Sequence, residues 1–230
     1  QHQGKQKNTV AKVDAFTESI LSAAKYKQFK EEKEMDTSYS TPTGIRLRIN
    51  CHYERGNSSL AARIIPDKVP SLEDIGIEDL EYLCDEKEGL ILFTGPTGAG
   101  KSTSLAAMIQ HIATHKGGHI VTLEDPVEFV FKSEKGLIRQ RQLGRDFLEF
   151  PAALRGVLRQ DPNIIMVGEM RDLETIAAAL TLAETGHLVF ATLHTPNAMQ
   201  TIDRIVDVFP PHQQQQIRTQ LSLSLRAIVA

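Results

Sequence analysis

The chain has 230 residues, of which 41% are hydrophobic and 24% charged, and its formal net charge is −3. This composition predicts a soluble globular protein of one or two domains, and it gives no support for nucleic acid or an anionic membrane surface as the main partner. Cys51 and Cys84 lie far apart and outside any C-x-x-C pair, which argues against a disulfide scaffold or a zinc site and favours a reducing compartment.

The first third of the chain carries the pattern of a small α/β or antiparallel module. In the stretch Ile45-Arg46-Leu47-Arg48-Ile49, apolar and basic residues alternate strictly, which is the period of a β-strand. This alternation places Arg46 and Arg48 on one side of the strand and the apolar residues on the other. The expected elements are a helix over residues 10–34 and strands over residues 36–39, 45–49 and 60–65.

The composition of the sequence changes between Pro66 and Pro70, which enclose a short polar stretch. Prolines at this spacing are typical of a linker. Ser71 is followed three residues later by Asp74, a spacing that predicts a cap at the start of a short helical turn. We therefore expect an N-terminal domain over residues 1–68, a linker over residues 69–76 and a second domain over residues 77–230.

Beyond the linker, apolar runs alternate with helical stretches. The runs are apolar on both faces, which is typical of a parallel sheet that helices cover on both sides. We expect an α/β fold of this kind. The expected strands are residues 90–93, 120–123, 164–167 and 188–193, and the expected helices are residues 102–114, 150–160, 173–183 and 217–230.

The central motif is GPTGAGKS, from Gly95 to Ser102, which fits the pattern G-x-x-x-x-G-K-[ST]. It lies between an expected strand and an expected helix, the context in which this motif binds phosphates. Backbone N–H groups and the helix N-terminus would surround the phosphates, while Lys101 would reach the β- and γ-phosphates and Ser102 would ligate Mg²⁺. The expected nucleotide-binding residues are Gly95, Pro96, Thr97, Gly98, Ala99, Gly100, Lys101, Ser102 and Thr103.

Polar residues follow the other expected strands, at the ends where ligands bind in a parallel sheet. We expect these residues to gather around the phosphate loop, because the carboxyl ends of parallel strands meet at one edge. Hydrolysis of a nucleotide needs groups that hold Mg²⁺, orient a water and accept its proton. The residues concerned are Glu124, Asp125 and Glu128 after the second run, Glu169 and Arg171 after the third, and His194 after the fourth.

Each of these side chains has two interpretations. Glu124 or Glu169 would be the base, and the other would lie in the outer shell of the metal, reached through water. His194 would hydrogen-bond the γ-phosphate and report its loss. A helix cap or turn residue is the alternative for each acid, and Asp125, directly before a proline, is the weaker metal candidate. His187 stands just before the fourth run, where a structural histidine is an equally good interpretation.

Four blocks of the sequence together resemble one protein family. They read GPTGAGKSTSLAAMI, HIVTLEDPVEF, IIMVGEMRDLETI and TGHLVFATLHT. Their order and spacing are similar to the Walker A, aspartate box, Walker B and histidine box of the secretion ATPase superfamily, the motors of type II and type IV secretion and type IV pili. The resemblance covers residues 36–230 and includes Gly168, where many NTPases place an aspartate. GEMRDLET and TIDRIVDVFP look most like the pilus retraction motors.

The resemblance implies a RecA-like P-loop NTPase core preceded by a smaller, incomplete PAS-like N-terminal α/β domain. In that domain of the family, arginines reach toward the nucleotide. By match, Arg48 and Arg63 are the residues implied here, with Arg46 a weaker one, and an exposed basic strand face is the alternative. The family's C-terminal helical domain, and the zinc tetracysteine block of many assembly motors, would lie beyond Ala230. We therefore expect a piece of a longer protein, with no zinc in this piece.

The resemblance also implies a function: a homohexameric, Mg²⁺-dependent ATPase that drives type IV pilus retraction and twitching motility. It would act on a pilus platform protein, from the cytoplasm, at the inner face of the bacterial cytoplasmic membrane. Arginines supplied across such a site contribute roughly 10³ to 10⁵ in rate, so an isolated monomer is expected to be a poor ATPase.

Three alternatives stay open at this point. The first is a pilus assembly or type II secretion ATPase of the same superfamily. The second is a RecA-like nucleic-acid translocase, which the net charge of −3 and the lack of a basic or aromatic-rich tract argue against. We expect no nucleic-acid partner for that reason. The third is a regulatory switch that holds nucleotide without turnover, against which the pairing of Glu124 and Glu169 argues.

Overall fold

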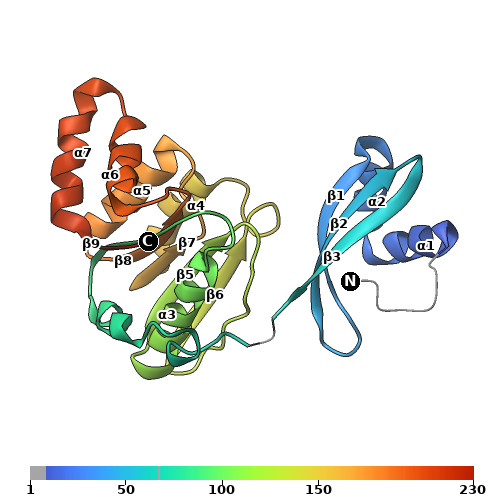
Figure 1. Ribbon diagram of the computed structural model, residues 1–230, viewed down its shortest axis with the longest axis horizontal. Helices are drawn as coiled ribbons and strands as arrows, with labels where there is room; N and C mark the ends of the chain where they lie inside the picture. The colour runs from blue at the N-terminus through green and yellow to red at the C-terminus, as the bar shows by residue number, and fades with distance from the viewer. Residues whose placement is uncertain (1–8, 67) are drawn as a thin grey trace. The chain divides into compact units, whose positions relative to one another are not determined.

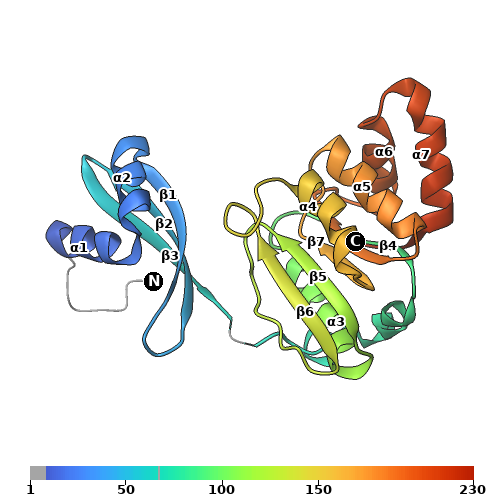
Figure 2. The ribbon, with the colours of Figure 1, turned by 180° about the vertical axis from the view of Figure 1, so that it is seen from behind.

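The computed structural model describes residues 9–66 and 68–230. The chain divides into two compact units, residues 1–67 and 68–230. Figures 1 and 2 show the elements of each unit from opposite sides. In the described part of the chain, no helix is long and apolar enough to cross a membrane.

In the N-terminal unit, two helices pack on one face of an antiparallel sheet with the strand order β1-β2-β3 (Figure 1). The core between helices and sheet contains Phe29, Ile49 and Cys51. Because side chains alternate along β2, Arg46 and Arg48 lie on the face away from this core, as the sequence predicts. The elements are α1 Val10–Ile20, α2 Ala23–Glu32, β1 Glu34–Ser40, β2 Arg46–Glu54 and β3 Asn57–Ile65.

The single helix expected over residues 10–34 is wrong, because the chain breaks between α1 and α2. Leu21 has extended backbone angles, with φ −99° and ψ 142°. The Ser22 hydroxyl accepts a hydrogen bond from the Lys25 N–H at 3.3 Å. This cap satisfies an N–H group that has no partner within the helix, so a second helix begins here.

The second unit is built on a parallel sheet with the strand order β6-β5-β7-β8-β4-β9. Helix α3 covers one face together with the 3-10 helices η1 and η2, and α4 to α7 cover the other (Figures 1 and 2). The elements are η1 Glu73–Ile75, η2 Glu78–Asp85, β4 Gly89–Thr94, α3 Lys101–His115, β5 Gly118–Glu124, β6 Gly136–Gln142, α4 Phe150–Val157, η3 Leu158–Gln160, β7 Ile164–Val167, α5 Leu173–Glu184, β8 Leu188–Leu193, α6 Ala198–Asp207, α7 Pro211–Ser224 and β9 Leu225–Val229.

The expected parallel sheet is confirmed, but its two outer strands are not among the expected elements. The helix expected over residues 217–230 ends at Ser224, and residues 225–229 form β9, which pairs in parallel with β4. This segment forms its hydrogen bonds with β4, and the local periodicity of the sequence cannot predict a pairing between such distant segments. At the other side of the sheet, β6 is half exposed and lacks the continuous apolar run by which the inner strands are recognised.

The cap predicted at the start of the second unit is confirmed. The Asp74 N–H donates to the Ser71 hydroxyl at 3.1 Å, and the Ser71 N–H donates to the Asp74 carboxylate at 2.9 Å. The backbone hydrogen bond from Ser71 lowers the pKa of Asp74. This reciprocal pair satisfies two backbone N–H groups at the start of the second unit.

Candidate functional site

The candidate site lies at the carboxyl edge of the parallel sheet. Every strand of this sheet runs in the same direction, so the segments that follow β4, β5, β7 and β8 all leave from one edge. A sheet of this kind binds its ligands there. The strand order also places β8 directly between β7 and β4, which brings residues distant in sequence into contact.

The phosphate loop occupies residues 95–100, between β4 and α3. Gly98 and Gly100 have φ values of 85° and 91°, a region that glycine adopts without strain. Helix α3 starts at Lys101, directly after Gly100. The N–H groups of Lys101, Ser102 and Thr103 lie in the first turn, where they have no partner within the helix. Such a helix start, with its partial positive charge, can bind the phosphates of a nucleotide.

Lys101 turns back over the loop that precedes it. Its Nζ donates to the carbonyl oxygens of Gly95, at 2.7 Å, and Pro96, at 2.9 Å. Burial lowers the pKa of Lys101, while the charges of Glu169 and Glu128 act in the opposite direction. The ammonium group is therefore held at the loop by contacts with neutral carbonyl oxygens, which a negatively charged phosphate can replace with stronger ones.

A continuous chain of polar contacts links the ends of three strands to the phosphate loop. Arg171 lies 2.7 Å from Glu169 and 3.7 Å from Asp125. On its other side, Glu169 lies 3.4 Å from Nε2 of His194. Nδ1 of His194 in turn lies 3.4 Å from Nζ of Lys101. The structure thus brings together Asp125, Glu169, Arg171, His194 and Lys101, all of which the sequence analysis singles out.

Glu124 is placed differently from the other acids. It is buried, with 4% of its surface exposed, and one carboxylate oxygen accepts hydrogen bonds from Thr122 at 2.6 Å and Gln140 at 3.0 Å. Burial raises the pKa of Glu124, and these hydrogen bonds oppose the effect. A carboxylate enclosed in this way is poorly placed to accept a proton from a water at the phosphate loop.

Glu128 is a residue that the sequence analysis names without assigning it a role. It is exposed, and its charge opposes the effect of burial on the pKa of Lys101. Its neighbours Phe129 and Phe131 are buried in the core on the α3 side of the sheet. In this segment the buried Phe129 and Phe131 alternate with exposed residues. This alternation in the sequence is the signal that Glu128 is exposed, unlike the buried Glu124.

One other predicted residue of this unit, His187, lies outside this cluster. The carbonyl oxygen of His187 accepts the Gly89 N–H at 3.0 Å, at the start of β4 and thus at the opposite edge of the sheet. Nδ1 of His187 lies 3.1 Å from the Leu182 carbonyl oxygen, to which it can only donate. Arg48 and Arg63 belong to the N-terminal unit, where they face each other across β2 and β3, and their contact with nucleotide stays a prediction.

Gly168 follows β7 where the strand passes close to β5. Its N–H donates to the Leu123 carbonyl oxygen at 2.7 Å. A Cβ atom at this position would lie 3.1 Å from that oxygen and 3.3 Å from Cα of Glu124. The close approach of the two strands therefore leaves little room for the aspartate that many NTPases carry here.

The side chains near the phosphate loop fit Mg²⁺ in a particular way. Magnesium prefers oxygen ligands, and at nucleotide sites proteins supply only one or two of them besides phosphate and water. Ser102, Glu169 and Asp125 are oxygen donors of this kind. In residues 9–66 and 68–230, no group of three or more His, Cys, Asp or Glu side chains is arranged to hold a metal ion. A site completed by phosphate and water agrees with both observations.

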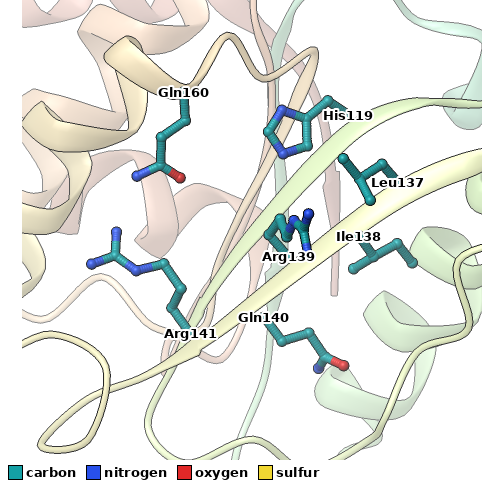
Figure 3. Close-up of a pocket in the computed structure, with 7 residues that line it drawn as sticks. All are labelled: His119, Leu137, Ile138, Arg139, Gln140, Arg141 and Gln160. Carbon is teal, nitrogen blue, oxygen red and sulfur yellow. The ribbon is translucent and has the colours of Figure 1, made fainter.

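A hollow of about 570 Å³ lies elsewhere, beside β6. Figure 3 shows Arg139 and Arg141 on the same side of β6 as His119 and Gln160, while Gln140 points to the other side. None of the predicted site residues lines this hollow. The candidate site is thus a surface of the second unit at the carboxyl edge of the sheet, separate from this hollow.

Comparisons with known proteins give a consistent result. Residues 58–230 match the model of the family described as type II/IV secretion system protein. The type IV pilus retraction ATPase PilT of Pseudomonas aeruginosa is 48% identical over 219 residues, which cover 95% of this chain and 64% of that protein. A twitching motility protein of Neisseria gonorrhoeae is 46% identical over 92% of this chain and 57% of its own length.

A solved structure is similar over the same range. The crystal structure of the pilus retraction motor PilT with bound ADP superimposes with a TM-score of 0.90 and 47% sequence identity. The match covers 93% of this chain and 63% of that one. This chain spans 57% to 64% of the length of the relatives compared.

Proposed function

Because the chain belongs to the type II/IV secretion system protein family, we propose that it is an ATP-hydrolysing motor subunit that drives retraction of a type IV pilus. The observation that carries this proposal is the chain of contacts from Asp125 through Arg171, Glu169 and His194 to Lys101. It joins a phosphate-binding loop to acids at the neighbouring strand ends, as hydrolysis of a phosphoanhydride requires.

Binding of ATP uses the loop and the start of α3. The phosphates take the place of the Gly95 and Pro96 carbonyl groups as partners of Lys101, and the N–H groups at the helix start bind the same oxygens. Mg²⁺, when bound beside them, neutralises charge that develops on the phosphates during transfer. Ser102 would hold it directly, Glu169 through water, and Asp125 is the weaker further ligand.

The base for the attacking water is best assigned to Glu128. Of the acids near Lys101, Glu128 is exposed and makes no ion pair with another described residue, whereas Glu169 is paired with Arg171. Glu124 is buried and already accepts two hydrogen bonds. A carboxylate that is open to water can orient a water molecule and take its proton, and the exposed Glu128 meets this condition.

The relatives extend the proposal to the assembly. The relatives named above are called pilus retraction and twitching motility proteins, and this favours retraction over pilus assembly or secretion. By the same likeness we propose a homohexamer in the cytoplasm, acting on a platform protein at the inner face of the bacterial membrane. Arg48 and Arg63 of the N-terminal unit would complete the nucleotide site in that assembly.

The test of hydrolysis compares Lys101, the first residue of α3, with Lys116, which directly follows the helix. Lys101→Ala is expected to abolish ATP turnover and the nucleotide-induced rise in melting temperature. Lys116→Ala, at the far end of α3, where Lys116 pairs with Asp85, is expected to retain both. Turnover in Lys101→Ala equal to that of the unsubstituted chain would overturn the proposal.

The direction of force is tested in cells. In a strain that lacks its own retraction motor, the gene is expected to restore twitching, and the Lys101→Ala gene is not. Restored extension of pili in a strain that lacks its assembly motor would instead identify an assembly motor.

A further inference from the structure

The outer strand β6 extends beyond the helices that cover one face of the sheet. The core on the α4 to α7 side contains residues of β5 but, among the described residues, none of β6. On this uncovered face β6 carries Leu137, Arg139 and Arg141, which line the hollow of about 570 Å³. His119 of β5, which pairs with Leu137, and Gln160 of η3 complete the lining on the same side, as Figure 3 shows. The hollow therefore exists because the helical layer ends at β5.

The hollow carries positive charge that its own lining does not neutralise. Arg139 is exposed, and neither Arg139 nor Arg141 forms an ion pair with another described residue. Arg141 is held by neutral partners: it donates to the Asp146 carbonyl oxygen at 3.1 Å, and its guanidinium carbon lies 5.6 Å from the centre of the Phe147 ring. No acidic side chain is among the described residues that line the hollow. Two arginines thus face one space without a counter-charge.

His119 adds a polar atom without a partner. Its Nδ1 lies 3.3 Å from the Asp161 carbonyl oxygen, to which it can only donate. In the neutral ring Nε2 is then an acceptor, and in the protonated ring it is a second donor. Nε2 is buried and has no hydrogen-bond partner in the described part of the chain. Because buried polar atoms are nearly always hydrogen-bonded, this atom indicates a partner that the protein does not itself supply.

We propose that this hollow binds a phosphate monoester. Arg139 and Arg141 are two positions apart on one face of a strand, so their Cα atoms are about 7 Å apart and both side chains can reach one group between them. A phosphate monoester has three acceptor oxygens and nearly two negative charges, which is enough for two guanidinium groups. The two oxygens of a carboxylate are satisfied by a single guanidinium. The Gln160 amide is a further donor on the same side of β6.

The size of the hollow favours an organic phosphate over a bare ion. Its volume of about 570 Å³ lies within the range of roughly 300 to 1,000 Å³ that small-molecule sites occupy. Leu137, 43% exposed, offers an apolar surface for the organic part of the ligand. Three strands separate β6 from β4, so this site is distinct from the phosphate loop and does not depend on the proposed function. A soluble sugar phosphate and the headgroup of phosphatidic acid share the required chemistry.

The test maps the binding of defined probes on the whole chain. Amide chemical shifts are recorded by NMR while ribose 5-phosphate or inorganic phosphate is added, and the titration is repeated with Lys101→Ala to separate the phosphate loop from the hollow. We expect shifts of the lining residues in both proteins, at lower concentrations of ribose 5-phosphate than of inorganic phosphate. Sedimentation with vesicles that contain phosphatidic acid tests the lipid source, with phosphatidylcholine vesicles as the reference.

Substitution of Arg139 tests the residues that carry the inference. Arg139→Gln is expected to weaken binding of ribose 5-phosphate by about 10- to 100-fold, the effect of losing a hydrogen bond to a charged group. Its melting temperature should not change, because Arg139 is exposed. Arg139→Lys keeps the charge without the planar fork and should lose less. Arg145→Gln is the matched control, because Arg145 is exposed but does not line the hollow.

Shifts at the lining residues that weaken in Arg139→Gln, but not in Arg145→Gln, support the inference. Binding of phosphatidic acid vesicles that only Arg139→Gln abolishes supports it with a lipid headgroup as the source. Three results overturn it: no shifts at the hollow and no vesicle binding, equal weakening in the two glutamine variants, or tighter binding of a glutamate-rich peptide at the same residues. Binding of inorganic phosphate alone also overturns it, as an adventitious ion only. ATP turnover in the unsubstituted chain would remain in each of these cases.

Discussion

Nε2 of His194 lies 3.4 Å from a carboxylate oxygen of Glu169. The other ring nitrogen, Nδ1, lies 3.4 Å from the ammonium group of Lys101. Because an ammonium group only donates, Nδ1 must accept, and the proton of the neutral ring stands on Nε2, directed at Glu169. The imidazole therefore relays between the acid after β7 and the lysine that would bind the γ-phosphate.

Replacing His194 tests this relay. His194→Ala is expected to lower ATP turnover by about 100-fold or more, because the group that orients Glu169 and Lys101 is lost. Nucleotide affinity should change little, since the phosphate loop is intact. His187→Ala is the control, because His187 lies at the opposite edge of the sheet, and it should retain turnover. Equal losses in the two variants would show that the position of His194 has no special part in hydrolysis.

Glu128 is expected to be the acid on which turnover depends most. Glu128→Gln should lower kcat by about 10² to 10⁴, the usual range for a general base, and should leave nucleotide binding intact. Glu134→Gln removes another exposed carboxylate from the same connection between β5 and β6 and should have no such effect. Single-turnover kinetics and nucleotide titration of each variant give the two quantities. Full turnover in Glu128→Gln would return the role of base to Glu169.

The buried Glu124 makes stability depend on pH. Burial raises its pKa in the folded protein, so the folded state binds a proton more tightly than the unfolded state. The contribution to stability is present below the unfolded pKa and is lost as the pH rises through the folded pKa. In urea unfolding at a series of pH values, this decline is expected in the unsubstituted chain and absent from Glu124→Gln. Glu134→Gln, which changes an exposed residue, should show the same decline as the unsubstituted chain. Identical curves of unfolding free energy against pH for all three proteins would contradict the assignment of this pH dependence to Glu124.

Gly89 is the point at which β4 meets the end of α7. Its φ is 114°, and a Cβ atom there would lie 2.7 Å from the Ser224 carbonyl oxygen. Gly89→Ala is therefore expected to lower the free energy of unfolding by about 3 kcal/mol, through strain and a backbone clash. At Gly76, φ is also positive but nothing lies within 4 Å of a Cβ atom, so Gly76→Ala should lose only about 1 kcal/mol. Urea denaturation measures both, and equal losses would contradict the clash.

The sequence alone is enough to find the phosphate loop, the inner strands and the cluster of polar residues around Lys101. The spacing of glycines, Lys101 and Ser102 is a local property of the chain, and so is a strand that is apolar on both faces. When strands of this kind lie parallel, their carboxyl ends meet at one edge of the sheet. For this reason Asp125, Glu169 and His194 could be expected near the loop before any contact was known.

The tertiary structure alone decided which of these residues touch and which are buried. Lys101 and His194 are 93 positions apart, and they meet because β8 lies beside β4. Glu124 and Glu128 are similar in the sequence, but Glu124 is buried, where it accepts hydrogen bonds from Thr122 and Gln140, and Glu128 is exposed. Contacts between distant segments determine the strand order, the pairing of β9 with β4 and the burial of a carboxylate. The local periodicity of the sequence does not predict these contacts.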